Sequence, residues 1–117
     1  MSNGIVIIKV FEVVGSKLCV ASSDGQKVHD QIAAALNAGK DVRLSFSNVE
    51  SLTSAFLNAA IGQLYAEFSE QKIRGSLSVA DMTTDDVELL KRVVEAAKQY
   101  FKNPNQVKKI VGENLGG

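Results

Sequence analysis

Apolar and polar positions along the chain follow two different periods, and the N-terminal segments have the pattern of strands. Residues 5–14 read IVIIKVFEVV, which is dense in β-branched and apolar side chains and has no helical stripe. This pattern predicts a strand that is buried along most of its length. Gly15 and Ser16 interrupt the run, and residues 18–22 (LCVAS) predict a short second strand. The segment 5–22 is therefore predicted to form a hairpin.

Two later segments also have the pattern of strands. In residues 41–47 the side chains alternate between two faces, with Val42, Leu44 and Phe46 on one and Arg43, Ser45 and Ser47 on the other. A strand with one polar face indicates that helices cover only the opposite face of its sheet. Residues 76–80 (SLSVA) predict a further strand.

Three segments have helical periodicity and are predicted as helices over about 24–38, 54–69 and 84–102. In the first, Ser23 and Gln26 have the spacing of a capping box, and a glycine ends the helix. Its apolar stripe is Val28, Ile32, Ala35 and Leu36, followed by Gly39 as the left-handed C-terminal residue. The second helix is apolar nearly all round. That excess predicts either a central helix or a side that faces a partner.

The third helix has start and stop signals of its own. Thr83 or Thr84 is predicted to cap it, and Pro104 is predicted to end it. Glu88 and Arg92 are spaced to form an ion pair on its outer side. Phe46, Leu64 and Leu90 are predicted to be core residues.

The predicted order of elements is β-β-α-β-α-β-α. Three passages from strand to helix predict an α/β fold with a mixed sheet of about four strands and helices mainly on one face. The 117 residues suit a single domain, which we assign to residues 1–103, with a C-terminal tail over 104–117.

Composition and charge narrow the expected environment and partners. Thirteen basic residues balance thirteen acidic ones, so neither nucleic acid nor an anionic membrane is expected as a partner, and Lys108-Lys109 is interpreted as solvated charge. Cys19 is the single cysteine and is expected to be a buried thiol in a reducing compartment. The N-terminal apolar run is short, carries Lys9 and has no cleavage site. These features predict a cytoplasmic protein.

Few residues have the pattern of a catalytic or metal centre. His29 is the single histidine, and it lies mid-helix with no cysteine or second histidine to share a metal, so a solvated or half-buried side chain is expected. A catalytic triad would need His29 from a different helix. Asp81, Asp85 and Asp86 are close in sequence, but helix capping accounts for two of them. No metal or cofactor is expected.

Three hydroxyl side chains lie between the strand over 41–47 and the second helix: Ser51, Thr53 and Ser54. One interpretation is helix capping at a tight corner. The other is phosphorylation, because the start of a helix presents free N–H groups and tolerates a phosphate. A phosphate adds about −1.5 to −2 charges, and on an apolar docking surface that charge would expel a partner.

The segment LSFSNVESLTSAFLNAAIGQL, residues 44–64, resembles the central motif of STAS domains, the fold of bacterial anti-sigma-factor antagonists. In that motif a strand ends in an apolar–Asp–Phe-like triplet, a valine follows, and Asp-Ser-Ser/Thr-Gly opens a helix. Residues 44–46 match the strand end, Val49 matches the valine, and residues 53–56 fall on the helix start. The Ser/Ala-Phe ending of the motif, at residues 54–56, resembles still more closely that of a small, uncharacterised bacterial STAS-like family. The likeness is specific over roughly 42–64 and looser across about 5–102.

The departures from the motif concern the phosphorylated residue and the end of the domain. The family's phosphoacceptor serine maps onto Ser54, but Thr53 replaces the preceding acidic residue and Phe56 replaces the glycine. The last strand of a full STAS domain is missing unless the tail supplies it. The resemblance therefore supports the fold and a docking role more strongly than it supports phosphorylation.

The resemblance implies a non-enzymatic binding module in a partner-switching circuit. The implied partner is a histidine-kinase-like ATP-binding regulator that docks around the corner at Ser54. The expected docking residues are Ser51, Thr53, Ser54, Phe56 and Leu57. One alternative is a subunit that forms a homodimer or larger oligomer through its apolar helix or strand surface, with Ser54 as a cap only. Another is a small enzyme that uses Ser54 as nucleophile.

Overall fold

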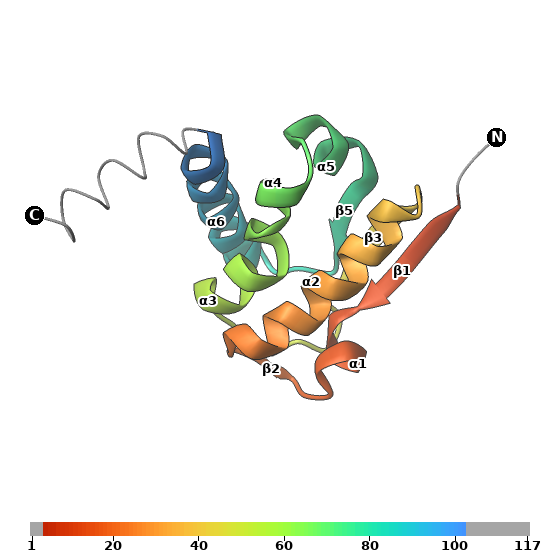
Figure 1. The fold of residues 1–117 in the computed structure, drawn as a ribbon. Helices are drawn as coiled ribbons and strands as arrows, with labels where there is room; N and C mark the ends of the chain where they lie inside the picture. The colour runs from red at the N-terminus through yellow and green to blue at the C-terminus, as the bar shows by residue number, and fades with distance from the viewer. Residues whose placement is uncertain (1–3, 103–117) are drawn as a thin grey trace, which may run out of the picture.

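The strands form two separate parallel sheets in residues 4–102, the part of the chain that the computed structural model describes (Figure 1). The larger sheet has the order β1 (Ile5–Lys9), β3 (Asp41–Ser45) and β5 (Leu77–Ala80), and the smaller one pairs β2 (Leu18–Cys19) with β4 (Ser51–Leu52). The predicted α/β fold is confirmed. The sheet differs from the predicted single mixed sheet of about four strands. The strands are divided between two sheets, and every ladder among the described residues is parallel.

The predicted hairpin over residues 5–22 is wrong. The chain leaves β1 as a short helix, α1 (Val10–Val14), which ends where the Gly15 N–H donates to the Phe11 carbonyl oxygen at 2.8 Å. Gly15 has a φ of 78°, a conformation that favours glycine. The β-branched residues of this segment favour a strand only where a partner strand is available. Burial of Val10 in the core takes precedence over that preference.

The three predicted helices form close to their expected positions, and α5 (Glu70–Ser76) appears as a second unpredicted helix besides α1. The helical elements after α1 are α2 (Ser22–Asn37), α3 (Ser54–Leu57), the wider π-helical turn η1 (Asn58–Gly62), α4 (Leu64–Glu67), α5 and α6 (Thr84–Lys102). The helix predicted over about 54–69 is therefore α3, η1 and α4 in succession. The additional helix α5 is capped by the Ser69 hydroxyl, which accepts the Lys72 N–H at 3.0 Å.

The predicted tail over 104–117 lies outside the described residues. So do Pro104 as the end of the third helix, the basic pair Lys108-Lys109 and any last strand from this segment. Among residues 4–102, no helix is long and apolar enough to cross a membrane.

α2 packs side by side with α3 and η1, and a glycine allows the close approach. A Cβ at Gly25 would lie 2.4 Å from the Phe56 carbonyl oxygen and 2.9 Å from Ala59 Cβ. The apolar stripe predicted for α2 is buried. Phe56 and Ala59, which face Gly25 across the helix crossing, are buried as well. Gly25 therefore sets the distance between α2 and the helix that begins at Ser54.

The ends of α2 confirm one predicted signal and correct another. Gly39 follows the helix with a φ of 77° and donates its N–H to the Leu36 carbonyl oxygen at 3.0 Å, as predicted. The capping box of Ser23 and Gln26 is wrong, because the helix begins at Ser22. Gln26 lies one turn into the helix and its side chain donates to Asp30 at 3.0 Å.

Helices cover one face of the larger sheet (Figure 1). Val42 and Leu44 point into the core, whereas Arg43 on the same strand is exposed, as predicted. Ile5 and Ile7 lie on the uncovered face of β1 and are 63% and 59% exposed. Ser45 shares the register of that uncovered face but is buried.

Ser45 is buried by the segment that follows β5. The Ser45 hydroxyl donates to Asp81 Oδ2 at 2.7 Å, and Asp81 itself has a φ of 63°. Ser47, which follows the strand, is exposed and donates its N–H to the Ser45 hydroxyl at 3.3 Å.

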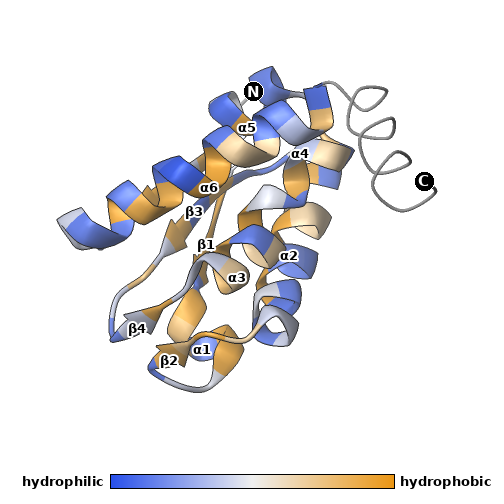
Figure 2. Cartoon of the chain, turned by 90° about the vertical axis from the view of Figure 1, so that its left-hand side faces the viewer, coloured by the Kyte–Doolittle hydropathy of each residue, from blue (hydrophilic) through white to orange (hydrophobic). Residues whose placement is uncertain are grey.

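Two of the three predicted core residues are confirmed as core. Phe46 is 3% exposed and Leu64 is fully buried, whereas Leu90 is only partly buried. α6 packs chiefly against η1, α3 and α4, which leaves room beside β5 where Leu90 lies. Figure 2 shows apolar and polar residues alternating along α6, as expected for a helix with one covered side.

Candidate functional site

The corner before Ser54 is fixed to the N-terminal part of the chain by backbone hydrogen bonds. The N–H groups of Glu50 and Ser51 both donate to the Lys17 carbonyl oxygen, at 2.9 and 3.2 Å, and the Thr53 N–H donates to the Cys19 carbonyl oxygen at 3.3 Å. These bonds continue the β2–β4 ladder up to Thr53, the residue before α3. The corner is therefore held by the fold before any partner binds.

Thr53 caps the helix and also ties it to the neighbouring segment. Its hydroxyl oxygen accepts the Phe56 N–H at 3.1 Å, and its hydroxyl hydrogen is donated to the Val20 carbonyl oxygen at 2.7 Å. Of the two interpretations of the three hydroxyls, capping is the one that Thr53 confirms. With both functions of its hydroxyl occupied, Thr53 is a structural residue of the corner.

Ser54 has different surroundings from its neighbour. It is the first residue of α3, it is exposed, and its hydroxyl makes no hydrogen bond to any described residue. Ser51 lies in β4 and is half-buried. Phe56 and Leu57 are fully buried core residues, which corrects their predicted place in a docking surface. Their side chains hold α3 against the core and present nothing to a partner.

A groove of about 570 Å³ opens beside Ser54, between the start of α3 and α6. We call it the Ser54 groove. Its lining consists of Ser54, Ala55, Asn58, Leu89, Arg92, Val93 and Ala96. Small and apolar side chains make most of this lining, and Arg92 is its one charged residue. This is a surface that an apolar side chain or an anionic group could occupy.

Arg92 is a site residue that the sequence pattern assigned elsewhere. The predicted ion pair between Glu88 and Arg92 is wrong, because Glu88 pairs with Lys91 at 3.8 Å. Within residues 4–102, Arg92 takes part in no ion pair. The sequence contains the competing partner, since Lys91 lies three residues after Glu88 and can pair with the same carboxylate.

His29 is buried, which corrects the expectation of a solvated or half-buried side chain. Its Nδ1 lies 3.0 Å from Asp30 Oδ1, and its Nε2 contacts the Glu67 carboxylate across the α2–α4 interface. Burial lowers the pKa of His29, but the hydrogen bonds and charges of Asp30 and Glu67 raise it more, so the pKa lies above its usual value. Both ring nitrogens are engaged by carboxylates, and neither bonds to Ser54.

The acidic residues after β5 do not assemble a cluster at the site. Asp81 accepts the Ser45 hydroxyl, while Asp85 and Asp86 lie in the first turn of α6. The Asp86 N–H donates to the Thr83 hydroxyl at 3.2 Å, which identifies Thr83 as the capping residue. Within the part of the chain that the structure describes, no group of three His, Cys, Asp or Glu side chains could hold a metal ion.

The comparisons with known proteins give a family match over a segment that contains Ser54, Ala55 and Asn58 of the groove but not its lining residues on α6. The family model described as STAS-like domain of unknown function (DUF4325) matches residues 24–87, which is more than half of the chain. The match runs from the start of α2 to the first turn of α6. No curated protein and no solved structure matches the chain.

Proposed function

The chain belongs to the family of STAS-like domains of unknown function, and we propose that it is a non-enzymatic module that docks a protein partner at the Ser54 groove under the control of phosphorylation at Ser54. One observation carries this proposal. Ser54 is exposed, and its hydroxyl has no hydrogen bond to the described residues. The hydroxyl of Thr53, the residue before it, both donates and accepts a hydrogen bond.

The rigid corner supports a docking role. Partners that bind preformed surfaces lose little conformational entropy on association. Thr53 and the β2–β4 ladder hold the rim of the groove, and the buried Phe56 and Leu57 anchor the helix behind it. Docking then uses the exposed side chains of this region, with Ser54 and Ala55 on one wall and Arg92 on the other.

The lining of the groove supports control by charge. A phosphate on Ser54 would add about −1.5 to −2 charges at the edge of a mostly apolar groove. A partner that buries apolar surface there would have to desolvate that charge, which is costly. Arg92 lines the same groove and would offer the phosphate a cation, so that the phosphate would occupy space that the partner needs.

The nature of the partner comes from the resemblance of residues 44–64 to anti-sigma-factor antagonists. It implies a histidine-kinase-like ATP-binding regulator, which would both dock at the groove and phosphorylate Ser54. Thr53 stands where that motif has an acidic residue, and its hydroxyl is already used for capping. Ser54 is therefore the proposed acceptor and Thr53 is not.

The test begins with capture of partners from the native cell and continues with titration of the purified partner. Ser54→Asp should weaken binding by at least about tenfold, because it places a charge against buried apolar surface. Ser54→Ala should bind the partner like the wild type. When it is incubated with the partner and Mg-ATP, it should take up no phosphate, whereas the wild type should. The matched control is Ser69→Asp, since Ser69 is an exposed cap at the start of α5 and aspartate is an equally good cap. Equal affinities for Ser54→Asp and the wild type would contradict the proposal.

A second candidate function is self-association through the uncovered face of the larger sheet. Ile5 and Ile7 are more than half exposed there, and Arg43 lies beside Ile7 in the ladder. Analytical ultracentrifugation of the wild type and of Ile7→Lys distinguishes the two functions. A dimer that Ile7→Lys dissociates, combined with no effect of Ser54→Asp on any partner, would favour an oligomeric subunit in which Ser54 is only part of the helix start.

A further inference from the structure

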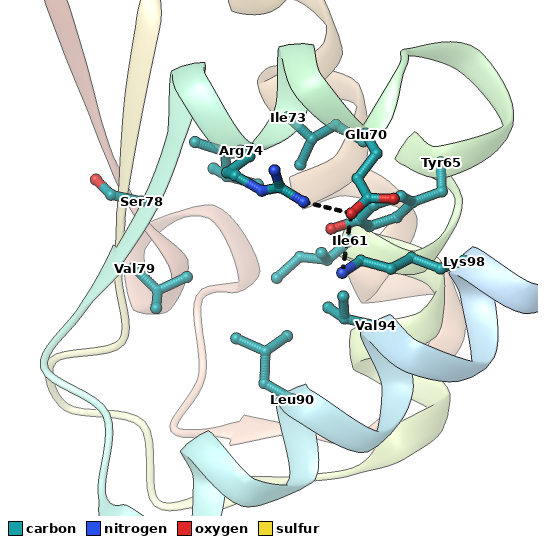
Figure 3. Close-up of a pocket in the computed structure, with 11 residues that line it drawn as sticks. Ile61, Tyr65, Glu70, Ile73, Arg74, Ser78, Val79, Leu90, Val94 and Lys98 are labelled. Carbon is teal, nitrogen blue, oxygen red and sulfur yellow. Dashed lines mark hydrogen bonds and ion pairs between the residues drawn. The ribbon is translucent and has the colours of Figure 1, made fainter.

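A second cavity, of about 360 Å³, lies between β5, α5 and α6 and shares no lining residue with the Ser54 groove (Figure 3). We call it the β5–α6 cavity. Its apolar wall is formed by Ile61, Ile73, Leu77, Val79, Leu90 and Val94. Its volume is at the lower end of the range for small-molecule sites, about 300–1,000 Å³.

The cavity exposes a part of the sheet that the architecture would otherwise bury. Val79 pairs with Leu44 in the ladder and therefore points to the same, helix-covered face. Leu44 is fully buried, yet Val79 is 38% exposed, because α6 packs against η1, α3 and α4 and stands away from β5. Leu90 and Val94 on α6 are only partly buried for the same reason. An apolar molecule in this space would remove all three side chains from water.

Polar side chains gather at one side of the cavity, as Figure 3 shows. Glu70 contacts both Arg74 and Lys98, and Lys98 Nζ lies 3.3 Å from Glu70 Oε2. Lys98 also contacts Glu95, which does not line the cavity, at 3.7 Å. The lining therefore carries two cations and one carboxylate.

Hydrogen-bond donors remain available at this side. A guanidinium has five N–H donors, and among the described residues the contact of Arg74 to Glu70 uses Nη2. The Tyr65 hydroxyl also lines the cavity and has no hydrogen bond to the described residues. Burial raises the pKa of Tyr65, so its hydroxyl stays protonated and can donate. The carboxylates of Glu70 and Glu95 balance the charges of Arg74 and Lys98, so the surplus is of hydrogen-bond donors, beside an apolar wall.

We propose that the β5–α6 cavity binds a small monocarboxylate with an apolar body, such as a medium-chain fatty acid. The apolar body lies against Val79, Leu90 and Val94, and the carboxylate accepts hydrogen bonds from Arg74 and Tyr65. Arginine suits this role because its planar fork matches a carboxylate. The site is independent of docking at Ser54, so either proposal can fail without the other.

The experiment titrates the full chain with sodium octanoate and follows methyl resonances by NMR. Saturable shifts are expected at Val79, Leu90 and Val94. Octylamine, which has the same chain and the opposite charge, should bind at least about tenfold more weakly, as expected for loss of a charge-assisted hydrogen bond. Arg74→Gln should weaken octanoate binding several-fold. The control is Lys91→Gln, because Lys91 is an exposed cation of α6 that does not line the cavity.

Leu90→Trp gives a second test by filling the cavity, and it should abolish the shifts. If that variant does not fold, Arg74→Gln still decides the question, since Arg74 is exposed and its loss leaves the core unchanged. The proposal is overturned by an absence of saturable binding, by shifts that map to other residues or by equal affinity for octanoate and octylamine. It is also overturned if Arg74→Gln and Lys91→Gln behave alike.

Discussion

Gly25→Ala tests the helix crossing that positions the Ser54 groove. In an exposed helix the change from glycine to alanine stabilises a protein by about 0.5–1 kcal/mol. At Gly25 the added Cβ would lie 2.4 Å from the Phe56 carbonyl oxygen and 2.9 Å from Ala59 Cβ. The closer contact is a backbone atom of the neighbouring helix, which cannot rotate away as a side-chain end can. α2 and α3 would have to separate.

The expected magnitude follows from two opposing effects. Overpacking of a tight core contact costs about 1–3 kcal/mol, and a backbone contact this short belongs at the upper end of that range. Subtracting a helix-propensity gain of about 1 kcal/mol leaves a net loss of about 2 kcal/mol in the free energy of unfolding. Urea denaturation measures it as a lower midpoint at unchanged slope.

Two other helical glycines provide the matched controls. Gly75 in α5 has no atom within 4 Å of the position of an added Cβ, so Gly75→Ala should raise the free energy of unfolding by about 0.5–1 kcal/mol. At Gly62 the added Cβ would meet the Asn58 side chain at 2.5 Å, and that amide can move, so Gly62→Ala should fall between the two. If Gly25→Ala proves as stable as Gly75→Ala, the close crossing of α2 and α3 is wrong, and with it the geometry of the groove.

Three further outcomes are expected. Leu64→Ala should lower the free energy of unfolding by about 2–5 kcal/mol because Leu64 is fully buried, whereas Leu18→Ala, at a side chain 54% exposed, should change it by less than about 0.5 kcal/mol in the same denaturant titration. Thr53→Ala should cost about 0.5–2 kcal/mol by loss of the cap, and Thr53→Ser should restore most of it; equal losses would show that the hydroxyl is not the group that matters. Burial lowers the pKa of His29, but its two carboxylate contacts raise the pKa more, so the folded pKa is raised. The contacts of protonated His29 with Asp30 and Glu67 should therefore add fully to the free energy of unfolding below about pH 6.5. This contribution should be lost as the pH rises through the folded pKa of His29. Unfolding measured across this window should show that loss in the wild type, and His29→Gln should remove it.

The parts of the fold that the sequence predicts are those whose pattern is local. The stripe of α2, the Gly39 end and the Thr53 cap each depend on residues within one or two turns, and all three are confirmed. The helix α1 was missed because Val10–Val14 have strand propensity, and only contacts with distant residues turn them into a helix. Ser23 is not the cap of α2, because the helix already begins at Ser22.

The groove shows why a site is harder to predict than a fold. A helical stripe indicates that Phe56 and Leu57 are apolar contact residues, but it does not say whether the contact is the chain's own core or a partner. Here both side chains are buried in the chain's own core, and α2 packs against α3 at the close approach that Gly25 allows. Arg92 was placed in an ion pair because i,i+4 spacing is favourable, while the competing Lys91 at i,i+3 takes Glu88 instead. Exposed pairs of either spacing differ by only a few tenths of a kcal/mol, so spacing alone cannot decide between them. What decides the role of Arg92 is that α6 lies beside the start of α3, and this contact joins residues more than thirty positions apart in the sequence.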